Sequence, residues 1–155
     1  MELFLVQHGK AHSEAEDPER SLTEEGTREV ERIAAWAGRT TISPHEIVHS
    51  GKRRAQQTAE ILARHLSPPG GVRAVEGLAP ADDVEPWASR LAERGDSLMI
   101  VGHLPFLARL AGRLVAGNAA REAVRFRFGG IVHLVRDGDG WHLAWAVHPG
   151  LPGIE

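Results

Sequence analysis

Short apolar runs alternate with helical patterns along most of the chain. The apolar runs predict strands at 3–7, 46–49, 72–75 and 98–102. Between them, apolar residues recur at three- and four-residue spacing, which predicts helices at 24–37, 53–66, 83–93 and 105–116. Strands that alternate with helices are typical of an α/β domain with a mainly parallel sheet.

The last third of the chain has a different pattern. Two apolar segments, 130–136 and 141–147, flank the tetrapeptide Asp137-Gly138-Asp139-Gly140. Its Asp-Gly steps supply the positive φ angles that a tight hairpin turn requires. We therefore expect an antiparallel pair at one edge of the sheet. With no internal repeat and no convincing linker, residues 1–155 are expected to form a single domain.

Composition and charge narrow the function classes. The net charge of −3 argues against a general nucleic-acid binder, which needs a basic surplus. The chain has no cysteine, which excludes disulfides, thiolate metal sites and a cysteine nucleophile. The start of the chain lacks the basic segment of a signal peptide, and no apolar stretch approaches the roughly 20 residues that span a bilayer. We expect a cytoplasmic protein without nucleic-acid or membrane partners.

Two histidines stand directly after predicted strands. His8 follows the strand at 3–7, and His103 follows the strand at 98–102. In open parallel sheets the ligand crevice lies beyond the carboxyl ends of the strands. Gly9 would let the chain turn sharply and let a ligand approach the backbone. One such histidine could be a hydrogen-bonded structural residue, but two equivalent placements favour a shared catalytic mouth.

Three cations, Lys52, Arg53 and Arg54, open the predicted helix at 53–66. Cations at a helix N-terminus oppose the helix dipole by roughly 0.3–1 kcal/mol each, whereas the backbone N–H groups and the dipole favour an anion there. A bound phosphate would resolve this conflict. A solvated surface cluster is the simpler explanation for Lys52 and Arg53, which leaves Arg54 as the candidate for the pocket.

Other motifs are weaker. Gly51-Lys52 lacks the preceding Gly and the following Ser or Thr of a nucleotide-binding P-loop. His8 and His12 are four residues apart but do not share a predicted helix, so no metal site is expected. The segment 125–128 alternates arginine with phenylalanine, which fits either stacking of single-stranded nucleic acid or a two-faced edge segment. The net charge favours the second interpretation.

Four motifs in this order resemble the histidine phosphatase superfamily (phosphoglycerate mutase-like), specifically its small SixA-type phosphohistidine phosphatase branch. They are Gln7-His8-Gly9, residues 20–26, residues 50–58 and Gly102-His103-Leu104-Pro105. The resemblance implies a three-layer α/β/α sandwich with the active site at the carboxyl ends of the strands.

The resemblance also implies roles for individual residues. His8 takes the place of the family's nucleophile, and His103 that of its second phosphate-contacting histidine. Arg20 and Arg54 match its phosphate-binding arginines. Gln7 and Gly9 flank the nucleophile, and we expect them to contact the phosphate as well. No cofactor is implied.

One departure from the family pattern concerns Gln7, which stands where an Arg-His-Gly triplet ordinarily supplies another arginine. A full charge at about 4 Å contributes a raw Coulomb energy of about 4 kcal/mol at an effective dielectric of 20, before desolvation is subtracted. Glutamine still donates a hydrogen bond from its amide. We therefore predict weaker phosphate binding with the chemistry retained. A second departure, Gly51 in place of the proline of many relatives, should affect loop stiffness more than charge.

Larger members of the family carry an acid between the positions matching Arg54 and His103, where it protonates an alcohol leaving group. The carboxylates considered for this role in that interval are Glu76, Asp82, Asp83 and Glu85. Asp82 and Asp83 are the candidate proton donors, although no carboxylate there stands in a diagnostic motif. A P–N bond demands less of an acid, because an imidazole nitrogen is protonated more readily than an alkoxide is expelled.

The expected substrate is therefore the phosphorylated histidine of a phosphotransfer-type protein. Small phosphate monoesters such as sugar phosphates are the alternative among enzymes, with carboxylates near 82–85 supplying the proton. A phosphohistidine-binding module without turnover is a third hypothesis, motivated by Gln7. The sequence predicts neither the physiological partner nor the oligomeric state.

Overall fold

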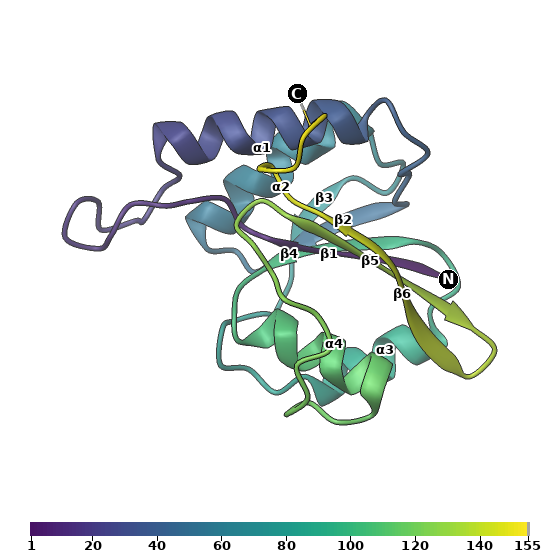
Figure 1. The fold of residues 1–155 in the computed structure, drawn as a ribbon. Coiled ribbons are helices and arrows are strands. Elements are labelled where there is room, and N and C mark those ends of the chain that lie inside the picture. The colour runs from purple at the N-terminus through teal and green to yellow at the C-terminus, as the bar shows by residue number, and fades with distance from the viewer. Residues whose placement is uncertain (155) are drawn as a thin grey trace.

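A six-stranded sheet lies between two pairs of helices in the computed structural model, which describes residues 1–154 (Figure 1). Its strands are β1 (Glu2–Gln7), β2 (Glu46–His49), β3 (Val72–Ala74), β4 (Leu98–Gly102), β5 (Ile131–Asp137) and β6 (Gly140–Val147). The spatial order is β3-β2-β4-β1-β5-β6. The first four strands in this order are parallel to one another, β5 is antiparallel to β1, and β6 is antiparallel to β5. The predicted mainly parallel sheet with an antiparallel edge hairpin is confirmed.

The helices also match the apolar spacing. They are α1 (Glu24–Ala37), α2 (Arg53–Leu66), α3 (Glu85–Glu93) and α4 (Phe106–Ala116). The side chain of Thr23 accepts a hydrogen bond from the backbone N–H of Gly26 and caps α1, which ends at Gly38 as expected. In residues 1–154, no helix combines the length and the apolar character needed to cross a membrane.

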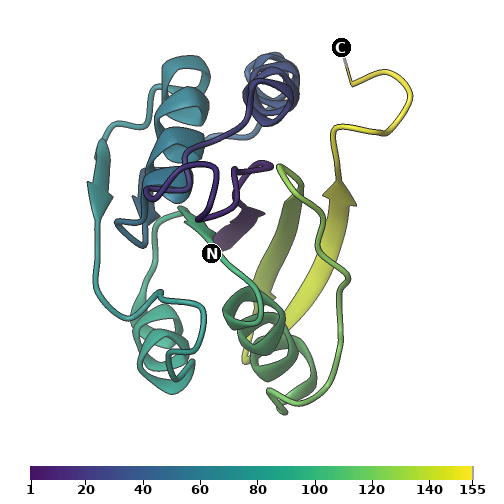
Figure 2. The same cartoon turned by 90° about the vertical axis from the view of Figure 1, so that its left-hand side faces the viewer.

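The central strand β1 is buried on both faces. Leu3 and Leu5 belong to the hydrophobic cluster that α3 and α4 cover, whereas Phe4 and Val6 belong to the cluster under α1 and α2. Because successive side chains of a strand point to opposite faces, a strand covered on both sides reads as a continuous apolar run. The pairs of helices therefore form the outer layers of the three-layer sandwich, and β1 leads to the middle of one end of the sheet (Figure 2).

The edge hairpin turns within two residues. Asp137 pairs with Gly140, so Gly138 and Asp139 form the turn. Gly138 has φ of 64°, whereas Asp139 is not among the residues with positive φ. One glycine in the left-handed region is thus enough for this turn, where the sequence pattern predicted positive φ at more than one position.

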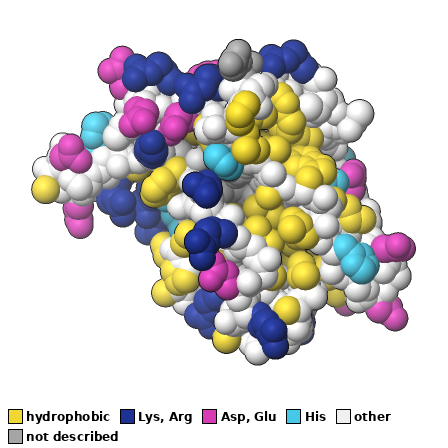
Figure 3. Space-filling model, viewed as in Figure 1, with side chains coloured by type: hydrophobic (Ala, Val, Ile, Leu, Met, Phe, Trp, Pro, Cys, Tyr) yellow, Lys and Arg dark blue, Asp and Glu magenta, His cyan; other side chains and the backbone are white. Residues whose placement is uncertain are grey.

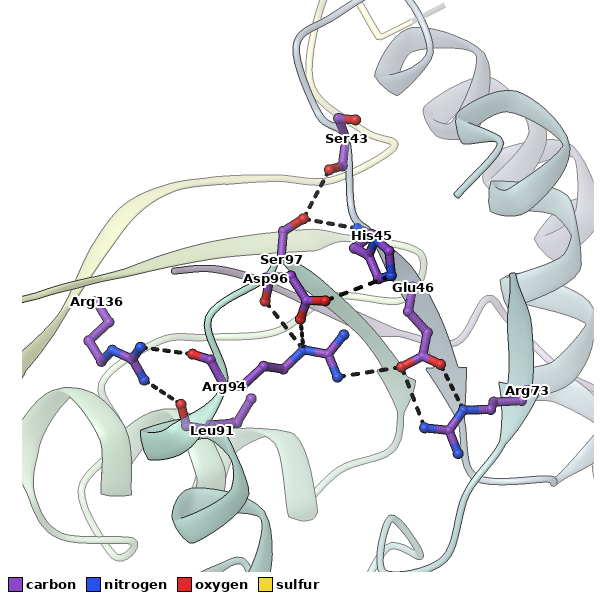
Figure 4. Close-up of polar contacts among 9 residues, drawn as sticks. All are labelled: Ser43, His45, Glu46, Arg73, Leu91, Arg94, Asp96, Ser97 and Arg136. Carbon is purple, nitrogen blue, oxygen red and sulfur yellow. Dashed lines mark hydrogen bonds and ion pairs between the residues drawn. The ribbon is translucent and has the colours of Figure 1, made fainter. Parts of the chain in front are cut away.

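Polar side chains connect the strands at the end of the sheet where β2 and β4 begin (Figure 4). The carboxylate of Glu46 accepts a hydrogen bond of 2.7 Å from Nε of Arg73 and lies 3.4 Å from Nη1 of Arg94. Arg94 also pairs with Asp96 at 2.8 Å, and Arg136 donates to the carbonyl oxygen of Arg94 at 2.8 Å. This network ties β2, β3, β5 and the segment before β4 to one another, away from the strand ends that carry the histidines.

The substitution Glu46→Gln should lower the free energy of unfolding by about 2 kcal/mol at neutral pH, because hydrogen bonds to charged groups contribute about 1.5–3 kcal/mol. The arginine hydrogen bonds, that of Arg73 first, hold the pKa of Glu46 below its ordinary 4.5. The stabilisation is therefore present at neutral pH and is lost as the pH falls below 4.5 through the lowered pKa. Urea unfolding at several pH values measures both effects.

A matched control is Glu24→Gln, which removes an exposed ion pair with Arg28 on α1. Exposed pairs contribute about 0–1 kcal/mol, so this variant should unfold close to the wild type. If Glu46→Gln is no less stable than Glu24→Gln, the network does not stabilise the sheet.

Candidate active site

His8 and His103 meet at the carboxyl ends of the adjacent strands β1 and β4. The backbone N–H of His8 donates to the carbonyl oxygen of Gly102 at 3.1 Å and so continues the parallel ladder one residue past Gln7. The imidazole ring centroids are 5.0 Å apart, and the two residues are only 7% and 2% exposed. Figure 2 looks at this end of the sheet, with the loop after β1 in front.

One ring nitrogen of His8 is fixed by the backbone. Nδ1 lies 2.7 Å from the carbonyl oxygen of Gly9. Because a carbonyl oxygen only accepts, Nδ1 carries the proton and Nε2 keeps a lone pair. Nε of Arg54 lies 3.4 Å from Nε2 and donates toward it. Nε2 of His8 therefore faces Arg54, the arginine that the sequence pattern assigned to the pocket.

Arg54 lies in the first turn of α2 and is held there by Thr58. The Thr58 hydroxyl donates to the carbonyl oxygen of Arg54 at 2.8 Å and accepts from the backbone N–H of Gly9 at 3.1 Å. Arg54 is 9% exposed and has no carboxylate partner within residues 1–154. Burial and the charge of Arg20 lower its pKa. A buried cation without a counter-ion favours binding of an anion.

Arg20 reaches the same region from the loop between β1 and α1. Its φ is 50°, and its Nε donates to the carbonyl oxygen of His12 at 3.2 Å. A surface hollow of about 330 Å³ is lined by basic side chains together with Pro18 and two carboxylates. These lining residues are Glu14, Pro18, Glu19, Arg20, Lys52, Arg53 and Arg54. Lys52 and Arg53 are exposed, as the surface-cluster interpretation predicted.

His103 has a second partner that sequence reasoning missed. The hydroxyl oxygen of Ser50 lies 2.6 Å from Nε2 of His103 and accepts a hydrogen bond of 3.3 Å from the backbone N–H of Lys52. Nδ1 of His103 is buried and has no partner in residues 1–154. Ser50 and Thr58 both lie inside the segment 50–58, but nothing in the spacing distinguished them from its other polar residues.

Both histidines are neutral at pH 7. Burial lowers the pKa of His8 to about 4, and the charges of Arg54 and Arg20 act in the same direction. Burial, followed by the charge of His8 and the nearby cations, lowers the pKa of His103 to about 3. A neutral imidazole whose other nitrogen is hydrogen-bonded is a competent nucleophile.

The imidazole of His8 should titrate near pH 4 in the folded protein, which an NMR titration of its ring protons measures. The same residue should titrate near its ordinary 6.5 in the urea-unfolded chain. Because the unfolded state then binds more protons, the native state loses stability as the pH falls from 6.5 toward 4. A folded-state titration near 6.5 would contradict the argument from burial.

Gly9 is required for a reason that the sequence did not predict. Its φ is not positive, and a Cβ atom there would lie 2.7 Å from Cγ2 of Val30 and 3.2 Å from Cδ2 of Leu22. The chain therefore does not use the left-handed region at Gly9. The glycine instead allows the loop after β1 to pack closely on α1.

Gln7 is 6% exposed and ends β1. Its side-chain Oε1 is buried without a partner in residues 1–154, and its backbone oxygen accepts a hydrogen bond of 2.9 Å from the N–H of Gly129. Gln7 follows Leu3 and Leu5 on the face of β1 that α3 and α4 cover. The unpaired atom is the amide oxygen, which can only accept a hydrogen bond.

Asp82 and Asp83 are engaged locally. Oδ2 of Asp82 accepts from the N–H of Ala79 at 2.9 Å, and Oδ1 of Asp83 accepts from the N–H of Glu85 at 3.0 Å. The second bond explains why α3 begins at Glu85, two residues later than predicted. Neither carboxylate contacts His8 or His103. The carboxylates that line the hollow with Arg20 and Arg54 come instead from Glu14 and Glu19, on the loop before α1.

Phe128 is a further neighbour that the sequence did not single out for this site. Its ring centroid lies 5.7 Å from that of His8. Phe126, by contrast, is buried in the core, whereas Arg125 and Arg127 are exposed. Phe128 is exposed like the two arginines, so the expected two-faced edge segment is wrong, and residues 125–128 form an irregular loop.

The described residues, 1–154, contain no group of three or more histidine or carboxylate side chains placed to hold a metal ion. Metal independence of the reaction stays a prediction.

The fold and the site define an α/β protein with paired histidines at the carboxyl end of its mainly parallel sheet. The chain belongs to the histidine phosphatase superfamily (branch 1), whose family model matches residues 3–82. The match includes His8, Arg20 and Arg54, and His103 lies beyond it.

Individual relatives match most of the chain. The chain is 29% identical over 123 residues to the phosphohistidine phosphatase SixA of Escherichia coli, covering 76% of each protein. It is 32% identical over 142 residues to an uncharacterised protein of Picosynechococcus, covering 86% of this chain and 84% of that protein. The solved structure of the protein histidine phosphatase SixA complexed with tungstate superposes with a TM-score of 0.83 at 24% identity, over 96% of this chain and 97% of that one.

Proposed function

We propose that this phosphatase removes the phosphoryl group from phosphohistidine of a partner protein through a covalent intermediate on His8. The observation that carries the proposal is the state of His8. Its Nδ1–H is held by the Gly9 carbonyl, and its Nε2 lone pair faces the unpaired guanidinium of Arg54. A nucleophile beside an uncompensated cation is suited to attack a phosphoryl group.

The reaction has two steps. Nε2 of His8 forms a bond to phosphorus while the P–N bond of the substrate breaks, and the leaving imidazole nitrogen takes up a proton from water. Water then attacks the phosphoryl-His8 phosphorus, inorganic phosphate leaves, and neutral His8 is restored. Arg54, Arg20 and His103 stabilise the charge on the phosphoryl oxygens in both steps, and Gln7 contributes an amide hydrogen bond.

The substrate class rests on two arguments. A protein named phosphohistidine phosphatase SixA is among the relatives of this chain. In addition, Asp82 and Asp83 are committed to local hydrogen bonds, so the interval between α2 and β4 brings neither of them to the histidines. A P–N bond requires less assistance from an acid than a P–O ester bond does.

Rapid quenching of the enzyme with a ³²P-phosphohistidine protein tests the proposal. The expected result is an acid-labile, base-stable label that maps to His8, with the same rate of turnover when EDTA is present. A label on another residue, or loss of activity in EDTA, contradicts the mechanism.

Small phosphate monoesters are a second candidate substrate class, because Glu14 and Glu19 line the hollow beside Arg20 and Arg54 and would supply a proton to an alkoxide. A panel of sugar phosphates and a phosphorylated phosphotransfer domain separates the two. A higher kcat/KM for the monoesters would reject phosphohistidine as the preferred substrate. A phosphohistidine-binding module without turnover would give no labelled intermediate at all.

The substitution Gln7→Arg should lower the inhibition constant of inorganic phosphate about tenfold, because part of the raw Coulomb gain of an added charge survives desolvation. Gln7→Met, which removes the amide without adding charge, is the control and should bind phosphate more weakly than the wild type. Inhibition by phosphate at constant substrate measures both. Equal or weaker phosphate binding by Gln7→Arg would show that position 7 does not face the anion.

A further inference from the structure

We propose that Phe128 and Leu104 form an apolar rim that receives the imidazole ring of the leaving group. This inference rests on the proposed function and adds the part of the site that recognises what the phosphoryl group is attached to. The arginines and histidines recognise phosphate only, and every phosphorylated molecule carries that group. Discrimination between leaving groups requires contacts beyond the phosphate.

Two exposed apolar side chains adjoin the site histidines, one through a ring contact and one along the chain. Among the described residues, the large hydrophobic side chains that are exposed are Leu104, Phe128, Leu143 and Leu151. Leu104 directly follows His103 and is 40% exposed, and Phe128 contacts His8 and is 44% exposed. Half of this small set therefore adjoins the two histidines. Exposed apolar groups beside a reactive side chain favour contact with a ligand.

The backbone fixes Phe128 relative to the nucleophile. The N–H of Gly129 donates to the carbonyl oxygens of Gln7 at 2.9 Å and His8 at 3.3 Å. Gly129 has φ of 70°, a conformation that suits glycine, and the preceding Phe126 is anchored in the core. The ring of Phe128 is thus placed by main-chain contacts, and its removal leaves those contacts in place.

The geometry suits a flat, partly apolar leaving group. The rings of Phe128 and His8 are tilted by 48° with 5.7 Å between centroids, and Phe128 also lines a surface hollow of about 350 Å³ together with Lys10 and His148. An imidazole that arrives with its phosphoryl group at Nε2 can pack on this ring. Aromatic pairs prefer offset or tilted arrangements with centroids about 4.5–7 Å apart. An amine without a ring gains nothing from such a contact.

Two substrates that contain the same scissile bond separate the effect of the rim from the chemistry of bond cleavage. Phosphohistidine and phosphoramidate both contain a P–N bond, and only phosphohistidine carries a ring. Phe128→Ala should lower kcat/KM for phosphohistidine about tenfold and that for phosphoramidate less than about twofold, as expected for loss of an aromatic contact. Leu104→Ala should cause a smaller loss with the same selectivity. Phe128→Trp should keep the preference for phosphohistidine.

Leu143→Ala is the matched control. Leu143 is 45% exposed and lies on the edge strand β6, within the part of the fold where Figure 3 shows a broad hydrophobic area. This variant should not change the ratio of the two kcat/KM values. If Leu143→Ala shifts the ratio as much as Phe128→Ala does, the rim proposal is wrong.

The remaining outcomes separate the two proposals. Equal losses of Phe128→Ala on both P–N substrates would show that the ring only supports His8, and the rim proposal would fail while the proposed function stands. A wild-type enzyme that hydrolyses monoesters but neither P–N substrate would reject the proposed function, and the rim proposal with it.

Discussion

Replacing His8 by alanine should reduce turnover of a phosphohistidine protein by at least about 10⁴-fold, as removal of a covalent nucleophile does in other enzymes. The variant retains Arg54, Arg20 and His103, so it should still bind phosphate. Steady-state kinetics with a quenched-flow assay for the phosphoenzyme measures the loss. No label should appear on the protein.

Two controls show whether the loss of turnover comes from unfolding of the variant or from removal of any histidine. Urea unfolding shows whether His8→Ala is still folded, because the imidazole is buried and its removal leaves a cavity. His142→Ala, which removes an exposed histidine of β6, should keep full activity. If a folded His8→Ala variant retains activity and forms a labelled intermediate, the nucleophile is another residue.

The substitution Arg54→Ala should lower kcat/KM by about 10²–10³-fold, the usual effect of removing a group that stabilises developing charge. Arg54→Lys should lie between the alanine variant and the wild type, because it keeps the charge but loses the planar fork. The matched control is Arg53→Ala, one residue earlier on α2, exposed and beside the same hollow. Its effect should stay within about threefold, since exposed charges contribute little.

Comparing the losses of kcat/KM in Arg53→Ala and Arg54→Ala shows whether the buried position of Arg54 is needed for its effect on the reaction. Thr58 ties the backbone of Arg54 to Gly9, so only Arg54 is both buried and directed at Nε2 of His8. Equal losses for Arg53→Ala and Arg54→Ala would mean that the phosphoryl group senses only the summed charge of the hollow.

The elements of the fold were predictable because local rules decide them. The apolar run at 3–7 is β1, and Thr23 and Gly38 bound α1 as their capping preferences suggest. The start of α3 was not predictable, since Asp83 satisfies a backbone N–H of the first turn while it lies outside the helix. Whether Asp83 lies within the helix or only caps it depends on the orientation of its side chain, which sequence spacing does not predict.

The candidate site was predictable only in outline. Strand-end position identified His8 and His103, but their separation depends on β4 and β1 being neighbours in the sheet. The cited contacts of Ser50, Thr58 and Phe128 join residues that are 49 or more positions apart, and no spacing rule reaches that far. Sequence reasoning recognises residues that carry chemistry more readily than residues that hold them in place.

The hydrogen bond from the N–H of His8 to Gly102 also limits where the chain can change in length. A strand advances by about 3.3 Å per residue, and a shift of one residue turns every side chain to the opposite face. One residue inserted within β4 would therefore move His103 away from His8 and point it toward the other layer of helices. The loops tolerate such changes far better, so this site constrains the length of two short strands more tightly than that of any other part of the chain.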